Sequence, residues 1–228
     1  MGILLQVADT ANKIANAAAA APQKISLWSL LDKGGWLMYP LYLLLVIAIF
    51  VFVERLIAIR KVSRIEPNFM SIIRDNIMSG NITAARSLAR NTDNPVAKII
   101  DKGLQRIGKP IDAIEKSMES VGRLEMYKLE RNLSVLSLIA GIAPMFGFLG
   151  TIVGMIQLFY EINSTGNFEL GVIAGGIYVK MITSGSGLII GLIAYVAHNF
   201  LSVQVDKTAN KMEVASAEFI DILQEPTK

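Results

Sequence analysis

Three long apolar stretches alternate with polar segments along this chain. The apolar stretches cover residues 36–59, 133–160 and 171–203, and each exceeds the roughly 20 apolar residues that a helix needs to cross a bilayer. Residues 60–132 and 204–228 are more polar but carry apolar positions at helical spacing. The chain shows no alternation typical of β-strands. The pattern predicts an all-α integral membrane protein with three transmembrane helices, whose long helices extend into a cytoplasmic helical domain.

Basic residues give these spans a direction. Lys and Arg follow the first span, precede the second and follow the third, whereas residues 161–170 contain neither. Because basic residues accumulate on the cytoplasmic side of a membrane, the N-terminus is predicted outside and the C-terminus inside. Residues 161–170 then form an outer loop, residues 60–132 a cytoplasmic helical region and residues 204–228 a cytoplasmic tail.

Residues 1–35 are interpreted as a retained amphipathic segment on the outer membrane surface. Apolar residues recur at helical spacing from Leu4 to Ala18, as in helices that lie in the membrane interface. The alternative is a cleaved signal, because Ala17–Ala21 resembles a small-residue cleavage region. However, no basic residue precedes the apolar start, and Gln6 and Asp9 interrupt it, which is unlike a secretory signal.

Turn residues divide the cytoplasmic region into short helices. From Ile111 no strong breaker occurs before Pro144, so the second membrane helix is predicted to extend well into the cytoplasm. Proline is favoured at the first position of a helix and disrupts the interior of one. On these grounds breaks are expected at Pro67, at Ser79-Gly80-Asn81, just before Pro95, and near Gly108 and Pro110.

Composition narrows the chemistry. The chain is 53% hydrophobic, has no cysteine and has one histidine, which excludes a disulfide framework and a thiolate metal site. No aromatic residues interleave with the basic ones, which argues against a nucleic-acid surface. No pairing of a nucleophile with a base is evident, so an enzyme is the least favoured class. We expect neither a metal nor a cofactor.

The second span is rich in glycine and has a hydroxyl at its centre. Pro144, Gly147, Thr151 and Gly154 fall on one face of a helix, and Gly150 adds a further small residue. Small residues allow membrane helices to approach closely, and a polar group at mid-membrane is a candidate for function. The alternative for Thr151 is a hydrogen bond to its own helix backbone, which threonine makes readily.

The third span carries a comparable stripe. Lys180, Ser184, Gly187, Gly191 and His198 are spaced by four, three, four and seven residues, and Thr183 borders them. A face with a charge, hydroxyls and glycines is unsuited to lipid. The alternative is a packing seam with Lys180 snorkelling outward. His198 lies near the inner end and is either an interfacial side chain or a proton relay.

These runs resemble a known family. The run from Ala143 to Ile156, with its Gly-Thr-Ile-Val-Gly-Met core, looks like a signature of the MotA/TolQ/ExbB family of proton-channel proteins, and Ile177–Gly191 resembles the family's third-helix signature. Glu54-Arg55-Leu56 also fits. Three spans, a large cytoplasmic loop and the chain length match the ExbB/TolQ branch, because MotA-type members have four spans and are longer.

The resemblance implies a subunit of an ion-driven motor in the bacterial inner membrane, with residues 1–35 and 161–170 in the periplasm. ExbB-like proteins form pentamers around the single membrane helices of an ExbD-like dimer, and a TonB-like protein completes the system. The partner supplies an aspartate that carries the proton. Thr151 and Ser184 match the hydroxyls that line its path, with Thr183 and Lys180 beside them.

The chain departs from the family pattern at two positions. Serine stands at Ser184 where threonine is common, and Val179 replaces a glutamate found in many members, with Lys180 next to it. Serine keeps the hydrogen-bond donor and acceptor of threonine. The Lys180 cation alters the electric field along the ion route, so that either a proton or a sodium ion fits as the transported ion.

Several readings of the function follow. The expected function is energising TonB-dependent transport across the outer membrane. A TolQ-like or gliding-type motor subunit, a non-conducting scaffold and a solute carrier are the alternatives, and the absence of a detectable repeat argues against the last.

Overall fold

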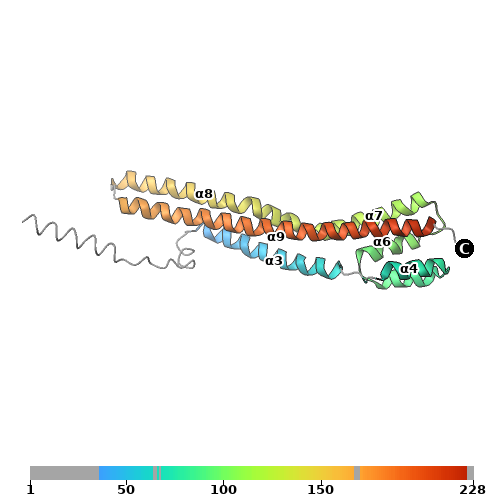
Figure 1. Ribbon diagram of the computed structural model, residues 1–228. Coiled ribbons are helices and arrows are strands. Elements are labelled where there is room, and N and C mark those ends of the chain that lie inside the picture. The colour runs from blue at the N-terminus through green and yellow to red at the C-terminus, as the bar shows by residue number, and fades with distance from the viewer. Residues whose placement is uncertain (1–35, 64–65, 67, 167–169, 225–228) are drawn as a thin grey trace, which may run out of the picture.

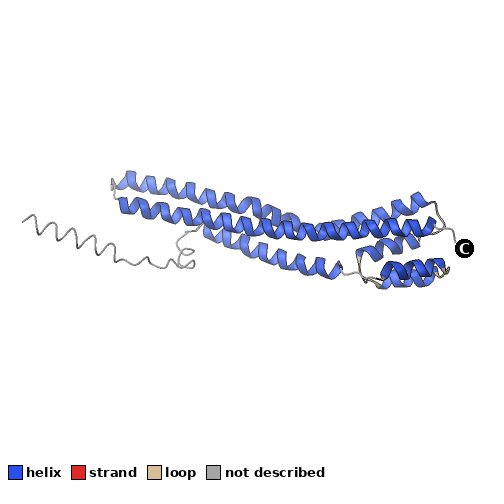
Figure 2. Ribbon diagram, in the orientation of Figure 1, coloured by secondary structure: helices blue, strands red, loops and turns tan. Residues whose placement is uncertain are grey.

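A computed structural model describes residues 36–63, 66, 68–166 and 170–224. All regular structure in these residues is helical (Figure 2), which confirms the all-α part of the predicted fold. Three helices are long and apolar enough to cross a membrane. The expected amphipathic segment at residues 1–35 and the break at Pro67 lie outside the described residues.

Three long helices lie side by side and give the molecule an elongated shape (Figure 1). They are α3 (Met38–Val62), α8 (Leu133–Thr165) and α9 (Leu170–Gln224). At 1.5 Å per residue, the 55 residues of α9 extend over roughly 80 Å. This length far exceeds a bilayer, so α9 continues from the apolar end into a second, polar end. The tail therefore extends the third membrane helix, as the sequence predicts.

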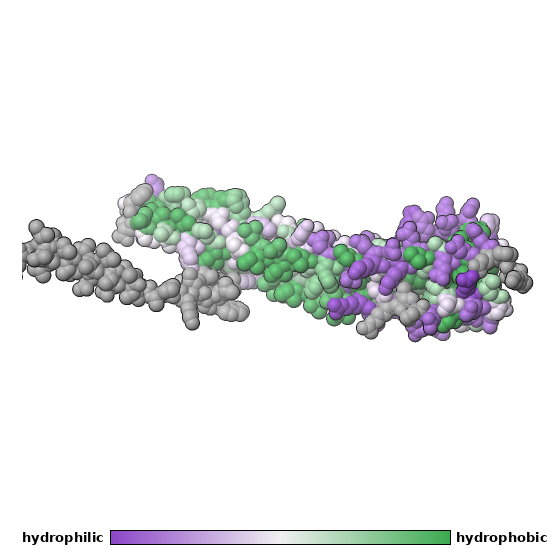
Figure 3. All heavy atoms as spheres, viewed as in Figure 1, coloured by the Kyte–Doolittle hydropathy of each residue, from purple (hydrophilic) through white to green (hydrophobic). Residues whose placement is uncertain are grey.

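Four shorter helices form a lobe around the C-terminal part of α9. They are α4 (Phe69–Met78), α5 (Ile82–Asn91), α6 (Pro95–Leu104) and α7 (Ile111–Glu130). Of these, α4, α6 and α7 contact α9, and α5 packs against α4 and α6. Figure 3 shows hydrophilic residues gathered over the lobe and hydrophobic ones over the long-helix end. The core of the lobe includes Ile73, Ile100, Met118 and Phe219, each fully buried.

The turns between the short helices lie where glycine, asparagine and proline predict them. After α4 the backbone of Gly80 takes a φ of +76°, a conformation that glycine adopts without steric cost. The Asn81 side chain accepts a hydrogen bond from the Ala84 N–H at the start of α5. Pro95 is the first residue of α6, and the Asn94 side chain caps that helix. Such caps satisfy backbone N–H groups that have no partner within the helix.

One expectation is wrong. The second membrane helix does not run unbroken from Ile111, because α7 ends at Glu130 and α8 begins at Leu133. Asn132 has a φ of +66°, and asparagine is among the few residues other than glycine that visit this left-handed region. By contrast Pro144 lies inside α8 without ending it, as prolines in membrane helices can.

Hydrogen bonds join the lobe to the end of α3. The Asn94 amide donates to the Val62 carbonyl over 2.8 Å, and the hydroxyls of Ser63 and Thr208 lie 2.7 Å apart. Arg55, which is buried, donates to the Lys128 carbonyl. These contacts tie α3 to α6, α7 and α9 where the apolar and polar ends of the molecule meet.

Candidate functional site

Helices α8 and α9 form an antiparallel hairpin and make the most extensive contact between helices in the described chain. Gly166 ends α8 with a φ of +64°. We call the contact between the two helices the glycine seam. It is made by Pro144, Gly147, Gly150 and Gly154 of α8 and by Lys180, Thr183, Ser184, Gly187 and Gly191 of α9.

At the centre of the seam the two backbones touch. A Cβ atom added to Gly187 would lie 2.6 Å from the Ala143 carbonyl oxygen and 2.8 Å from the Gly147 Cα. A Cβ atom on Gly147 would lie 3.1 Å from the Gly187 Cα. Because Gly187 has no room for a side chain and Gly147 has very little, small residues at both positions allow this helix separation.

On the lobe side of the seam centre, Gly191 packs against Pro144. A Cβ atom on Gly191 would lie 2.6 Å from the Pro144 Cγ and 3.1 Å from the Ala140 carbonyl oxygen. Proline has no N–H to offer the carbonyl four residues earlier, and that carbonyl belongs to Ala140. The Pro144 ring and the Ala140 carbonyl therefore form a surface that only a residue without a side chain can approach.

On the side of the seam centre toward the loop between α8 and α9, Thr183 contacts Gly150. The Thr183 Cγ2 would lie 2.7 Å from a Cβ atom on Gly150, and Thr183 is only 1% exposed. Its hydroxyl donates to the Val179 carbonyl at 3.5 Å. The sequence places Ser184 in the stripe and Thr183 at its border. In the structure both lie at the seam, because the Ser184 backbone packs against Gly147, but Thr183 is the more deeply buried and Ser184 is half-buried.

Thr151 follows Gly150 and therefore lies at the level of Thr183. Its side chain is half-buried, and its hydroxyl donates to the Phe148 carbonyl over 2.7 Å. This is the backbone hydrogen bond that the alternative interpretation anticipates. A hydroxyl that donates to its own helix still has oxygen lone pairs available to accept from, or coordinate, another group.

Lys180 occupies the outer part of the seam. Its aliphatic stem lies across Gly154, in the space where a side chain at that position would be. Glu161 near the outer end of α8 is exposed and forms no ion pair with Lys180 among the described residues. The Lys180 stem thus fills the seam at the level where the glycines would otherwise leave a gap.

The arrangement brings hydroxyls together without a permanent proton carrier. Thr151 follows Gly150, which contacts Thr183 across the seam, and Ser184 follows Thr183, so the three residues lie at about one level of the hairpin. Hydroxyls both donate and accept hydrogen bonds. Residues 133–160 and 171–203 contain no Asp or Glu. An ion that crosses at this level can be solvated by the hydroxyls, but a carboxylate that binds it has to come from another chain.

Two functional features escape the sequence reasoning. The first is the break at Asn132, whose left-handed backbone no pattern of apolar residues signals. The second is a cavity beside the lobe end of the seam, lined by His198, Ser134, Ser137 and Ser202. The signal for the cavity is present in the sequence as serines at helical spacing on α8, opposite the single histidine.

The described chain has three candidate membrane spans, and two of them form a close-packed hairpin that carries several hydroxyls. These features define the class as a multi-pass membrane protein with polar groups inside its helix contacts. Comparison with known proteins agrees. Residues 91–214 match the model of the MotA/TolQ/ExbB proton channel family. The chain belongs to this family.

Individual relatives support the assignment. The chain is 30% identical over 178 residues to a putative biopolymer transport protein ExbB homolog from Methanothermobacter thermautotrophicus, covering 76% of this chain and 63% of that protein. It is 34% identical over 90 residues to biopolymer transport protein exbB1 of Vibrio cholerae, covering 39% and 40% of the two chains. It is 28% identical over 106 residues to the Tol-Pal system protein TolQ of Haemophilus influenzae, covering 46% and 45%. The matches thus span less than two thirds of these relatives.

Proposed function

We propose that this chain is the ion-channel and stator subunit of an ExbB-ExbD-like motor in the bacterial inner membrane, with its N-terminus outside and its lobe in the cytoplasm. The observation that carries the proposal is the glycine seam with its hydroxyls and without a carboxylate in either span. Such a pair of helices can line an ion path but needs a partner to carry the ion.

The partner is a dimer of ExbD-like single-span proteins, each of which supplies one membrane aspartate. A homo-oligomer of this chain, a pentamer by analogy with the family, surrounds the two partner helices. Moving one charge down a potential of 100 mV releases about 2.3 kcal/mol. Several protons per cycle therefore supply enough free energy to turn one ring relative to the other.

The proposed task is to energise TonB-dependent transport across an outer membrane through a TonB-like protein. The two ExbB-named relatives are named as biopolymer transport proteins, with which this task agrees. A TolQ-like role is the second candidate, because the TolQ relative matches 46% of the chain. A chromosomal deletion complemented by this chain separates the two: restored uptake of a TonB-dependent substrate supports the first, and restored envelope integrity alone supports the second.

Loss of the Thr151 hydroxyl tests the ion path itself. Thr151→Val keeps the shape of the side chain but removes the group that can solvate an ion, so proton flux into vesicles that contain the complex should fall to background. Thr165→Val is the matched control, since its hydroxyl also bonds a carbonyl of α8, that of Glu161 over 2.8 Å, but lies at the end of the helix.

The assembled complex gives the control for folding. Thr151→Val should still form an oligomer of wild-type mass and retain the partner. Full flux in Thr151→Val, with the oligomer intact, would sink the proposed role of this hydroxyl.

A further inference from the structure

Two cavities form one furrow along the hairpin and the lobe. The first cavity, of about 740 Å³, lies between α8 and α9 and ends at Glu130. The second, of about 1010 Å³, lies between α7 and α9 in the lobe and also includes Glu130. We call the joined cavities the polar furrow. It leads from the apolar end of the molecule to the far end of the lobe.

The membrane end of the furrow is lined by apolar side chains and, among them, by polar groups that can exchange protons or hold water. His198 and Ser202 of α9 face the cavity together with Ser134 and Ser137 of α8. The titratable groups that line this cavity with His198 are Glu130 of α7 and Asp206 of α9. An imidazole can accept a proton on one ring nitrogen and release one from the other.

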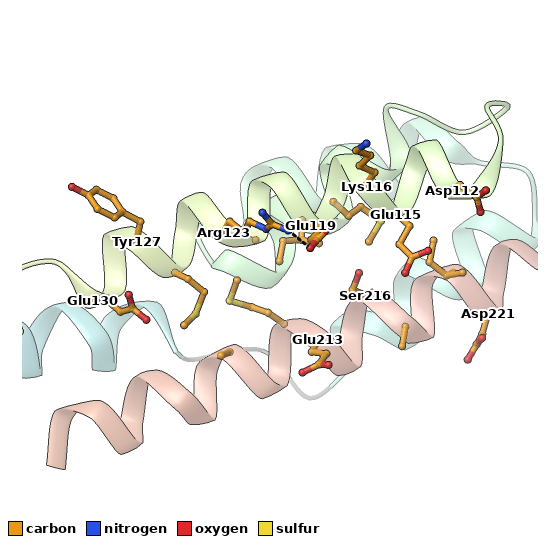
Figure 4. Close-up of a pocket in the computed structure, with 18 residues that line it drawn as sticks. Asp112, Glu115, Lys116, Glu119, Arg123, Tyr127, Glu130, Glu213, Ser216 and Asp221 are labelled. Atoms are coloured by element: carbon orange, nitrogen blue, oxygen red, sulfur yellow. Dashed lines mark hydrogen bonds and ion pairs between the residues drawn. The ribbon is translucent and has the colours of Figure 1, made fainter. Parts of the chain in front are cut away.

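The lobe end of the furrow carries an excess of carboxylates. Figure 4 shows them along α7 and α9, on both sides of the cavity. The only bases in the lining are Lys116 and Arg123, and Arg123 donates to Glu119 over 2.5 Å. A cleft lined by one sign of charge raises the local concentration of the opposite ion. The acidic members are Asp112, Glu115, Glu119, Glu130, Glu213 and Asp221.

We propose that the polar furrow is the cytoplasmic arm of the ion path, a water-filled, cation-selective route from the hydroxyl level to the cytoplasm, with His198 as the proton relay at its membrane end. This rests on the proposed function, because it assigns a cytoplasmic route to the ions that cross the membrane at the level of the hydroxyls. It adds residues outside the seam to the path and places them all on one face of α7, α8 and α9.

The furrow stops short of the hydroxyls. Its last residue on α8 is Met145, six residues before Thr151, a rise of about 9 Å along the helix. Over this interval the contact of Gly187 with Gly147 leaves no space between the helices. A proton therefore crosses the interval on a group that moves, and the membrane carboxylate of the partner is the group available.

Cysteine labelling tests whether the furrow holds water. The chain has no native cysteine, so each single-cysteine variant of the full complex reports one position. Ser137→Cys and Ser202→Cys should react with a charged, membrane-impermeant maleimide added to the cytoplasmic side. The matched control is Val196→Cys, which is 58% exposed, does not line the furrow and, from the pairing of Pro144 with Gly191, lies at the depth of Ser137.

The outcomes of the labelling experiment are distinguishable. No label at Val196→Cys and rapid label at the two serine positions supports a water-filled furrow. Labelling of the serine positions no faster than Val196→Cys overturns it. Disulfide-linked dimers of Ser137→Cys in place of labelling also overturn it, since a second copy of the chain would then cover the furrow.

Flux through His198→Gln tests the relay. Glutamine keeps a polar side chain of similar size but cannot take up and pass on a proton, so proton flux should fall several-fold while maleimide labelling of Ser137→Cys stays unchanged. Unchanged flux in His198→Gln overturns the relay. If the unmodified complex carries no flux at all, the proposed function fails, whereas the labelling result still decides whether the furrow is aqueous.

Discussion

The hairpin and the lobe share helix α9 but are held together by different physical means. In the hairpin, α9 presents Gly187 and Gly191 and contacts the backbone of α8 directly. In the lobe, the same helix presents Met212 and Phe219, which are buried among large apolar side chains. Lipid offers no hydrophobic gain for helix association, so close packing drives it, whereas water drives burial of apolar area. The surrounding solvent therefore decides which residues α9 needs along its length.

The largest expected effect is in the lobe. Phe219→Ala removes a fully buried ring whose edge lies against Gly103 and Met118, and such truncations cost about 3–5 kcal/mol. We expect the lobe to unfold at a lower denaturant concentration while the hairpin stays helical in detergent. Hydrogen exchange of the two regions measures this, and Phe219→Leu is the milder control. Equal loss of protection in the hairpin would show that the two regions do not differ as argued.

The corresponding change in the hairpin adds an atom instead of removing a ring. Gly187→Ala places a methyl group 2.6 Å from the Ala143 carbonyl oxygen, and overpacking of this kind costs about 1–3 kcal/mol. The helices should separate, so the oligomer should lose thermal stability and flux while the lobe keeps its protection from hydrogen exchange. Gly185→Ala is the matched control, because a Cβ atom there meets nothing within 4 Å. Similar melting of both variants would contradict the close contact.

A smaller effect is expected where the two regions meet. Asn94 is buried, caps α6 by accepting from the Val96 N–H over 2.8 Å, and donates to the Val62 carbonyl. Asn94→Ala removes the cap and leaves that carbonyl without this donor, which together cost about 1–2 kcal/mol. Asn81→Ala removes an exposed cap of α5 that accepts from Ala84 over 3.2 Å. Only Asn94→Ala should loosen the lobe from α3, measured by hydrogen exchange at Val62 and Ser63.

How much the sequence could predict follows from the same contrast. Apolar length predicts the three spans, and Gly80, Asn81 and Pro95 predict the turns of the lobe, because these signals are local. The break at Asn132 and the deeper burial of Thr183 than of Ser184 depend on how helices meet in space. A stripe at helical spacing gives the face of a helix only to within about one residue, since each step turns it by about 100°.

The smallest expected effect is electrostatic and confined to the lobe. The hydrogen bond and the charge of Lys98 hold the pKa of Asp93 below its ordinary value, and the two side chains lie 3.1 Å apart. A carboxyl whose folded pKa is lowered stabilises the fold above its unfolded pKa, and this contribution is lost as the pH falls through the folded pKa. Because Asp93 is exposed, the pair contributes about 0.2–1 kcal/mol.

Asp93→Asn removes this group from the titration. Its stability should fall slightly at neutral pH and approach that of the unmodified chain in acid. Glu66→Asn, which changes an exposed carboxyl outside this ion pair, is the control. Denaturation of the lobe, followed between pH 7 and the acid limit in low salt, measures both. A constant difference between Asp93→Asn and the unmodified chain at every pH would mean that the pair of Asp93 with Lys98 does not stabilise the lobe through charge.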